Sequence, residues 1–331
     1  MAKKDVEPEK VDTVESRLAN LIDKVSSEVG KNSIKLVSAG FERRPCAPFG
    51  IPSVDHLLNG GIPEGTIVDV FGAPGSGKST ICLHLLANQV KRNKIALIVD
   101  AEHKLDPMLA KTIGLDMSKH PYSQPETAEE AFDIIFAAAN NMSAGDVILV
   151  DSAAALVPKA VIDGDMEQKF MGGNSIVMSQ GIKKVLHAVS THGVILLFIN
   201  QIRQKIGVFY GPTTDTPCGM ALKFHANARI EVTKGQLIQR DNLNVGQMVT
   251  VKTIKTSHCA PFQSVVVPLY FGTGFDILQS EIDLALSQGI IVQAGAWYSY
   301  GEHKWQGVSN VYDTLKGNET LRQEIVSKLT I

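Results

Sequence analysis

The strongest chemical signal in the sequence is a glycine-rich loop that ends in lysine and serine. The loop follows the apolar run TIVDVF and precedes the helical run ICLHLLANQV. Glycines let backbone N–H groups approach phosphate oxygens, a lysine there adds a positive charge, and a serine hydroxyl can ligate Mg²⁺. The pattern therefore predicts a site for nucleotide phosphates. Its residues are Gly72, Ala73, Pro74, Gly75, Ser76, Gly77, Lys78, Ser79 and Thr80.

Two carboxylates follow apolar runs that are typical of buried strands. Asp151 closes the run Val147 to Val150, where P-loop NTPases carry a carboxylate that organises Mg²⁺, although an isolated aspartate at a strand end is usually a helix cap. Glu102 follows the run Ile95 to Val99. At the carboxyl end of a parallel sheet, where ligands collect, it could polarise an attacking water. A surface carboxylate in a loop fits the sequence of Glu102 equally well.

Two amides and two long polar segments complete the chemical pattern. Asn200 and Gln201 follow the run Val194 to Ile199, and their amides could sense a γ-phosphate or act as a structural cap. The segments Val161 to Ser175 and Arg203 to Met220 are too long for tight turns and are predicted to be loops. The second mixes cations and aromatic residues in a way that suits a single nucleic-acid strand, but the first is acidic. The residues alone leave DNA binding open.

Composition places these residues in a globular protein. The 331 residues include 32 Lys and Arg against 34 Asp and Glu, so affinity for a polyanion must come from local patches. Four widely spaced cysteines indicate reduced thiols and a cytoplasmic location. We expect no membrane partner, because the longest apolar runs are far shorter than the roughly 20 residues of a membrane span.

The hydrophobic pattern predicts an α/β fold. Apolar residues at three- and four-residue steps over 14–29 indicate one amphipathic helix. From residue 61, short β-branched runs alternate with helical patterns, which is typical of a mostly parallel sheet flanked by helices. Three later runs predict antiparallel hairpins that extend the sheet. These are Ala228 to Lys234, Met248 to Thr256 and Ser264 to Phe271.

Several strings together resemble the bacterial RecA recombinase family, over roughly residue 15 to the end of the chain. INQIR, ALKF and GAWYSY, in this order and spacing, are the most specific. The others are the phosphate loop, VDAEH with LDP, and VDS with AAL. The resemblance implies a RecA-like P-loop ATPase core with an N-terminal helix and a small α+β C-terminal domain. The expected parts are an N-terminal oligomerisation helix and tail at 1–37, a linker at 38–60, the core at 61–275 and the C-terminal domain at 276–331.

The resemblance implies an ATP- and Mg²⁺-dependent homologous recombinase. Such a protein forms a helical homopolymer on single-stranded DNA, pairs that strand with homologous double-stranded DNA, and hydrolyses ATP between protomers when DNA is bound. In that family the N-terminal helix docks on the neighbouring core. By this resemblance Glu102 is the catalytic carboxylate, aided by Lys78 and Lys255, and Gln201 senses the γ-phosphate.

The same resemblance assigns further residues. Asp106 and Leu109 would contact the nucleotide, Lys223 and Phe224 would lie at the subunit interface, and Lys255 would reach the neighbour's ATP. The two long segments, about 161–175 and 203–220, would be the DNA-contacting loops. The residues expected to bind DNA are Met171, Gly172, Gly173, Asn174, Ser175, Lys183, Arg203, Lys205, Ile206, Gly207, Val208, Phe209, Tyr210, Gly219 and Met220.

Three positions depart from the family pattern. Ser257 stands where a second lysine is usual, so sensing of the neighbour's phosphate would rest on Lys255 with help from His258. Leu109 replaces an aromatic residue that usually stacks on adenine, and Ile176 replaces a common arginine. Three alternatives stay open from sequence: a ring-forming RecA-core motor or clock-type ATPase, a P-loop kinase of a small substrate, and a structural member that binds ATP without turnover.

Overall fold

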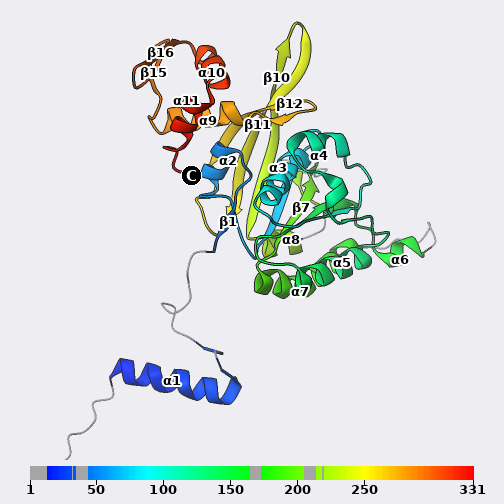
Figure 1. Cartoon of the computed structure of the whole chain (residues 1–331). Coiled ribbons are helices and arrows are strands. Elements are labelled where there is room, and N and C mark those ends of the chain that lie inside the picture. The colour runs from blue at the N-terminus through cyan, green and yellow to red at the C-terminus, as the bar shows by residue number, and fades with distance from the viewer. Residues whose placement is uncertain (1–12, 32, 35–43, 165–172, 205–213, 218–219) are drawn as a thin grey trace, which may run out of the picture. The chain divides into compact units, whose positions relative to one another are not determined.

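The computed structural model describes residues 13–31, 33–34, 44–164, 173–204, 214–217 and 220–331. The chain divides into two compact units, 1–44 and 45–331. The first contains helix α1 (Val14–Val29) (Figure 1). The Thr13 side chain caps its N-terminus and accepts a hydrogen bond from the Ser16 amide. None of its residues is buried within this unit. The predicted amphipathic helix is confirmed.

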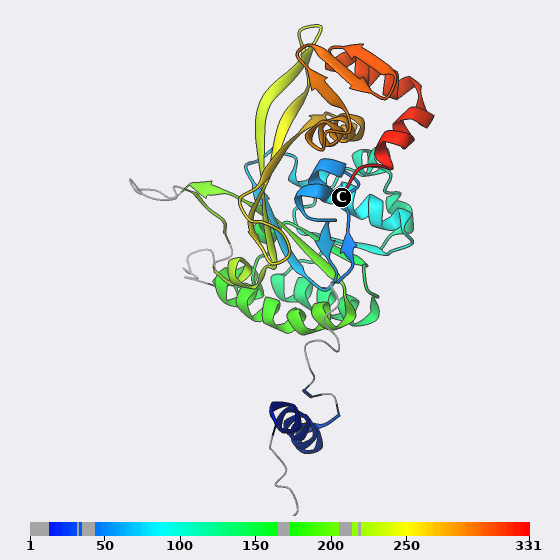
Figure 2. The same cartoon turned by 90° about the vertical axis from the view of Figure 1, so that its left-hand side faces the viewer.

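The second unit is built on a large sheet (Figures 1 and 2). Its nine strands have the order β13-β12-β11-β10-β3-β7-β6-β4-β5. Five neighbouring strands pair in parallel, which confirms the predicted parallel core. Their carboxyl ends therefore lie along one edge of the sheet, where the loops that follow them meet. These strands are β3 (Ile67–Gly72), β4 (Ala96–Asp100), β5 (Tyr122–Ser123), β6 (Val147–Asp151) and β7 (Ile195–Gln201).

The remaining strands extend the sheet through antiparallel hairpins, as predicted, although the first of them, β10, pairs in parallel with β3. The β10–β11 hairpin is longer than expected. Its outer part, from Thr233 on β10, is largely exposed on both faces, so the sequence there lacks the alternation that marks a half-buried strand. The four strands are β10 (Ala228–Arg240), β11 (Leu243–Thr256), β12 (Ser264–Tyr270) and β13 (Gly274–Phe275).

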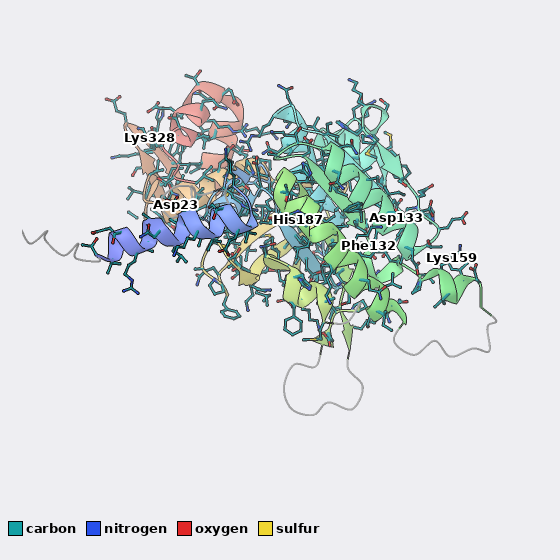
Figure 3. The ribbon with its side chains drawn as sticks, turned by 90° about the horizontal axis from the view of Figure 1, so that it is seen from below. Asp23, Phe132, Asp133, Lys159, His187 and Lys328 are labelled. Atoms are coloured by element: carbon teal, nitrogen blue, oxygen red, sulfur yellow. The ribbon has the colours of Figure 1, made fainter. Side chains whose placement is uncertain are left out.

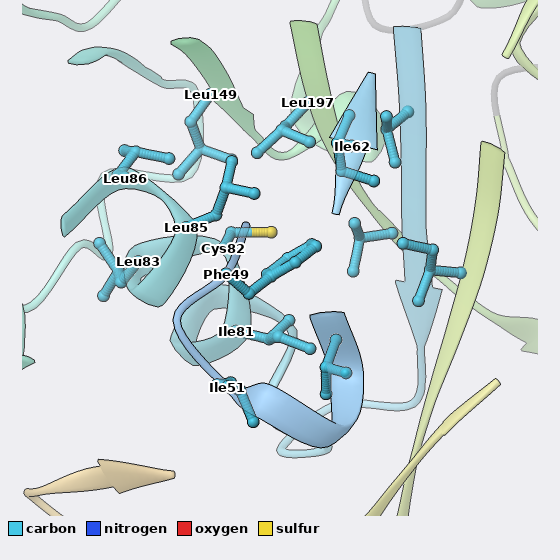
Figure 4. Packing of buried hydrophobic residues seen from close by; sticks show 14 of the residues in the cluster. Phe49, Ile51, Ile62, Ile81, Cys82, Leu83, Leu85, Leu86, Leu149 and Leu197 are labelled. Atoms are coloured by element: carbon cyan, nitrogen blue, oxygen red, sulfur yellow. The ribbon is translucent and has the colours of Figure 1, made fainter. Parts of the chain in front are cut away.

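Helices cover both faces of the sheet, and alternate strand residues supply the two cores. Leu197 joins the hydrophobic cluster on the face of the sheet that α3 covers. Phe49 and Leu85 belong to the same cluster (Figure 4). Its neighbour Phe198 joins the opposite cluster formed with α5 and α7, and its ring lies beside that of Phe132. Phe132 is labelled in Figure 3. The alternation between the two clusters is the two-residue period of a strand buried on both faces. The helices in this unit up to residue 225 are α2 (Pro52–Leu57), α3 (Lys78–Lys91), α4 (Pro107–Ile113), α5 (Ala128–Asn141), α6 (Lys159–Ile162), α7 (Gly173–His192) and α8 (Ala221–His225).

The two predicted loops are partly regular structure. Helix α6 takes in Val161, and α7 already begins at Gly173, so the prediction of a loop from 161 to 175 was wrong at both ends. In the second segment β8 (Arg203–Gln204) pairs with β9 (Thr214–Asp215). Short elements next to glycine-rich stretches are hard to predict because too few residues reveal their period. Several predicted DNA-binding positions lie outside the described residues, namely Met171, Gly172, Lys205, Ile206, Gly207, Val208, Phe209, Tyr210 and Gly219.

The C-terminal segment has a separate small core. Buried Ile282, Trp305 and Val311 belong to it, which confirms the expected α+β composition. No described helix is long and apolar enough to cross a membrane. The domain boundaries given above remain predictions. The elements of this segment are α9 (Ile277–Ser287), β14 (Val292–Ala294), β15 (Trp297–Tyr300), β16 (His303–Gln306), α10 (Val308–Gly317) and α11 (Glu319–Val326).

A separate two-stranded sheet, β1 (Cys46–Ala47) and β2 (Ile62–Pro63), precedes the main sheet in the chain.

Candidate nucleotide site

The glycine-rich loop joins β3 to the first turn of α3, as predicted. Gly75 and Gly77 have φ values of 70° and 97°, which glycine adopts without strain. Lys78 is buried, and its ammonium donates to the Ala73 carbonyl at 2.8 Å. Burial lowers the pKa of Lys78, against the opposing effect of the nearby Asp151 carboxylate. A buried cation whose described hydrogen-bond acceptor is a backbone carbonyl is suited to receive an anion.

Asp151 lies beside this loop at the end of β6. Its Oδ2 accepts a hydrogen bond from the Ser79 hydroxyl at 2.9 Å, across 72 residues of sequence. Burial raises the pKa of Asp151 to about 6, and the neighbouring carboxylates of Glu102 and Asp100 add to the rise. Two oxygen ligands and excess negative charge suit Mg²⁺, a cation that prefers oxygen donors. The residues present therefore fit the predicted metal.

Glu102 is held in place by three side chains. Its Oε1 accepts from the Ser152 hydroxyl at 2.5 Å and from Gln201 Nε2 at 2.8 Å. Its Oε2 forms an ion pair with Lys104 at 3.3 Å. Burial raises the pKa of Glu102, but these contacts outweigh burial and bring that pKa below its ordinary value. The carboxylate is therefore ionised at neutral pH.

Strand order explains why these groups meet. Gln201 on β7 pairs in register with Gly72 on β3, so the amide lies beside the start of the phosphate loop. The backbone N–H of Glu102 donates to the Asp151 carbonyl at 3.1 Å, which fastens the loop after β4 to the end of β6. Residues that are far apart in sequence are thus brought to one edge of the sheet.

Two cavities formed by described residues lie along this edge. One, of about 310 Å³, contains the phosphate-loop residues Gly75 to Thr80 together with Gln247, Leu269 and Phe271. These three residues belong to no motif, and sequence reasoning missed them. A second cavity of about 360 Å³ is lined by Ala101, Glu102, Lys104, Ala154, Ala155, Gln201 and Arg203.

Two residues expected at the nucleotide lie outside these cavities. The side chain of Asp106 caps α4 and accepts from the Met108 and Leu109 amides at 2.8 and 3.2 Å. The side chain of Leu109 is half-buried and packs against the hydrophobic cluster that contains Phe49 and Leu85. Neither residue lines the two cavities described here. Their contact with a nucleotide stays a prediction.

The predicted interface residues lie together. The Lys255 ammonium donates to the carbonyls of Lys223 and Phe224 at 3.0 and 2.7 Å, at the end of α8. The Lys223 ammonium in turn pairs with the Asp215 carboxylate, and the Phe224 side chain is exposed. His258 was expected to assist Lys255. Its Nε2 lies 3.0 Å from the Gly61 carbonyl oxygen and its Nδ1 lies 3.3 Å from the Thr256 hydroxyl, both within its own chain.

The described DNA-binding candidates are spread over several elements. Gly173, Asn174 and Ser175 form the first turn of α7, and Lys183 is exposed two turns further on. Arg203 follows Gln201 by two residues and lines the cavity that contains Glu102. The Met220 side chain is exposed at the start of α8, as is Ile176 on α7.

Comparison with known proteins agrees with this geometry. The protein-family model of the RecA N-terminal domain matches residues 16–276, and the family model of the RecA C-terminal domain matches residues 280–330. The chain belongs to the RecA family. Protein RecA of Thermus aquaticus is 39% identical over 316 residues, covering 94% of this chain and 93% of that protein. Protein RecA of Symbiobacterium thermophilum is 37% identical over 330 residues, which cover 98% of this chain and 93% of that protein.

Among solved structures, the RadB recombinase covers 69% of this chain and 98% of its own, with a TM-score of 0.52 and 17% identity, which shows a shared fold. Membership of the RecA family confirms the predicted fold and activity. The chain is an ATP-dependent homologous recombinase and a DNA-dependent ATPase. The match across both RecA domains argues against the ring-forming ATPase and the small-substrate kinase.

Proposed function

We propose that this RecA-family chain forms a helical filament on single-stranded DNA, binds ATP with Mg²⁺ between protomers, and pairs the bound strand with homologous duplex. Membership of the RecA family supports the filament and the pairing reaction. The observation that carries the ATP-dependent part is the placement of Glu102, which contacts Gln201 and Ser152 on one edge of the sheet beside Lys78 and Asp151. A base, a cation and a metal-binding carboxylate are thus gathered around one phosphate site. A cytoplasmic location stays a prediction.

The chain's own residues divide the work of hydrolysis. The amides of the phosphate loop and the Lys78 ammonium bind the β- and γ-phosphates. Ser79 and Asp151 would hold Mg²⁺, which when bound neutralises charge on the phosphate oxygens. Glu102 accepts the proton of the attacking water, and its three hydrogen-bond donors keep it oriented and ionised until then.

Nucleotide state would reach DNA through Gln201. Its amide donates to Glu102, and it is the last residue of β7, two positions before Arg203 opens the second loop. A γ-phosphate that draws the amide away from Glu102 would shift the strand end and the loop together. Lys255 lies away from this chain's own phosphate loop, because it pairs with Arg229, which pairs with Asp69 near the start of β3. There Lys255 and Phe224 would contact the neighbouring protomer, so that ATP is enclosed by two copies of the chain.

The direct test is ATP hydrolysis by the purified chain with and without single-stranded DNA, combined with negative-stain microscopy. We expect hydrolysis to be weak without DNA, to rise with DNA and to accompany helical filaments. Duplex product should form from homologous strands only. Absence of both DNA stimulation and filaments would contradict the proposal, and closed rings would favour a motor ATPase.

Asp151→Asn is expected to raise the Mg²⁺ concentration that half-saturates hydrolysis by at least about 10-fold, because an amide oxygen carries no net charge for the cation. A suitable control is Asp146→Asn at the opposite end of β6, where the carboxylate accepts from the Ile95 and Ser143 amides. Titration of Mg²⁺ at fixed ATP measures the effect. An unchanged half-saturation point in Asp151→Asn would exclude Asp151 as a ligand.

A further inference from the structure

A buried amide on the antiparallel part of the sheet contacts the phosphate loop. Gln247 lies on β11 and is 5% exposed. Its Nε2 donates to the Gly75 carbonyl at 2.8 Å, across 172 residues of sequence. Since β11 lies outside the parallel strands that carry the catalytic residues, this contact is an independent support for the loop.

The contact sets the direction of one peptide group. The bond between Gly75 and Ser76 is trans, so its carbonyl and its N–H point in opposite directions. When Gln247 holds the carbonyl, the Ser76 N–H is directed to the other side, where it meets the Ala73 carbonyl at 3.3 Å. A Cβ added at Gly75 would have no atom within 4 Å, so packing around that Cα does little to fix the loop.

Leu269 supports the loop from the neighbouring strand. It is the direct cross-strand partner of Gln247 and lines the same cavity. A Cβ added at Gly77 would lie 2.9 Å from Leu269 Cδ1, so the loop is packed tightly against this side chain. The pair thus supplies one polar and one apolar contact to two glycines of the loop.

We propose that Gln247 is a positioning residue that holds the phosphate loop in its nucleotide-binding conformation through the Gly75 carbonyl. The inference rests on the proposed nucleotide site. Without this hydrogen bond, the contact of the Ser76 N–H with the Ala73 carbonyl, at 3.3 Å, is the only one among the described residues that constrains the Gly75–Ser76 peptide group. The peptide then samples more orientations, and part of the binding energy of the nucleotide is spent in ordering it. Gln247 thereby determines affinity, and it takes no part in proton transfer.

The test is Gln247→Met in the full chain, because methionine matches glutamine in length and lacks the amide. We expect binding of mant-ADP with Mg²⁺ to weaken by about 3- to 10-fold, the effect of one net hydrogen bond. The KM for ATP should rise by a similar factor, with kcat at saturating ATP little changed. Gln247→Ser, which leaves room for a water at the carbonyl, should give an intermediate affinity and serves if the methionine variant does not fold.

Gln89→Met is the matched control. Gln89 is also buried and donates to a glycine carbonyl, that of Gly145, at 3.1 Å, but at the far end of α3. This variant should lower the melting temperature and keep the wild-type affinity for mant-ADP. If Gln247→Met or Gln247→Ser folds and binds as tightly as wild type, the inference is overturned. A wild-type chain that fails to bind mant-ADP would overturn the proposed function as well.

Discussion

Glu102→Gln is expected to slow DNA-stimulated ATP hydrolysis by about 10²- to 10⁴-fold, the usual contribution of a positioned general base. Glutamine keeps the length and one oxygen of the side chain, so the contacts from Ser152 and Gln201 can persist while the proton acceptor is lost. Nucleotide affinity and filament formation should remain close to wild type. Steady-state hydrolysis, mant-ADP binding and negative-stain microscopy together measure the three properties.

Glu129→Gln is the control for this substitution. The Glu129 carboxylate is on α5 and accepts from the Lys159 amide at 2.8 Å, away from the site. It should hydrolyse ATP at the wild-type rate. If Glu102→Gln also retains wild-type turnover, another group must activate the water, and the assignment of Glu102 fails.

Lys78→Ala is expected to weaken nucleotide binding by about 10- to 100-fold, since a charge-assisted hydrogen bond contributes about 1.5–3 kcal/mol. Hydrolysis should fall below detection. The melting temperature without nucleotide should stay the same or rise, because burial lowers the pKa of Lys78 and so disfavours its charged form when no phosphate is bound. Mant-ADP titration and thermal denaturation, each with and without Mg²⁺-ADP, separate the two effects.

Lys91→Ala provides a comparison on the last turn of the same helix. That lysine is exposed and distant from the loop, so binding and hydrolysis should match wild type. A Lys78→Ala chain that binds nucleotide as tightly as Lys91→Ala would show that the ammonium does not contact phosphate. A large drop in its melting temperature without nucleotide would instead assign Lys78 a role in stability.

Local sequence determined the parts of this protein whose chemistry lies in consecutive residues. The phosphate loop from Gly72 to Thr80 was predicted with its flanking strand and helix, because glycine spacing and the following apolar period are read within one short window. Helix α1 and the parallel strands were predicted for the same reason. The prediction was wrong at the ends of the first loop, where α6 is only four residues long.

Long-range contacts decided the rest of the site. From the residues alone, Glu102 and Gln201 fitted a structural role as well as a catalytic one, and only the resemblance to RecA favoured chemistry. Their contact spans 99 residues and exists because β4, β6 and β7 are neighbours in the sheet. Strand order depends on how whole elements pack, and no local pattern encodes it.

Gln247 shows the limit of sequence reading most plainly. A glutamine within a strand carries no motif, and its partner Gly75 lies 172 residues away. Residue patterns alone predicted the phosphate loop, the α/β core and the resemblance to the RecA family. Tertiary packing brings Asp151 and Gln247 to that loop and Glu102 to Gln201, because burial and strand register place their atoms within hydrogen-bonding distance.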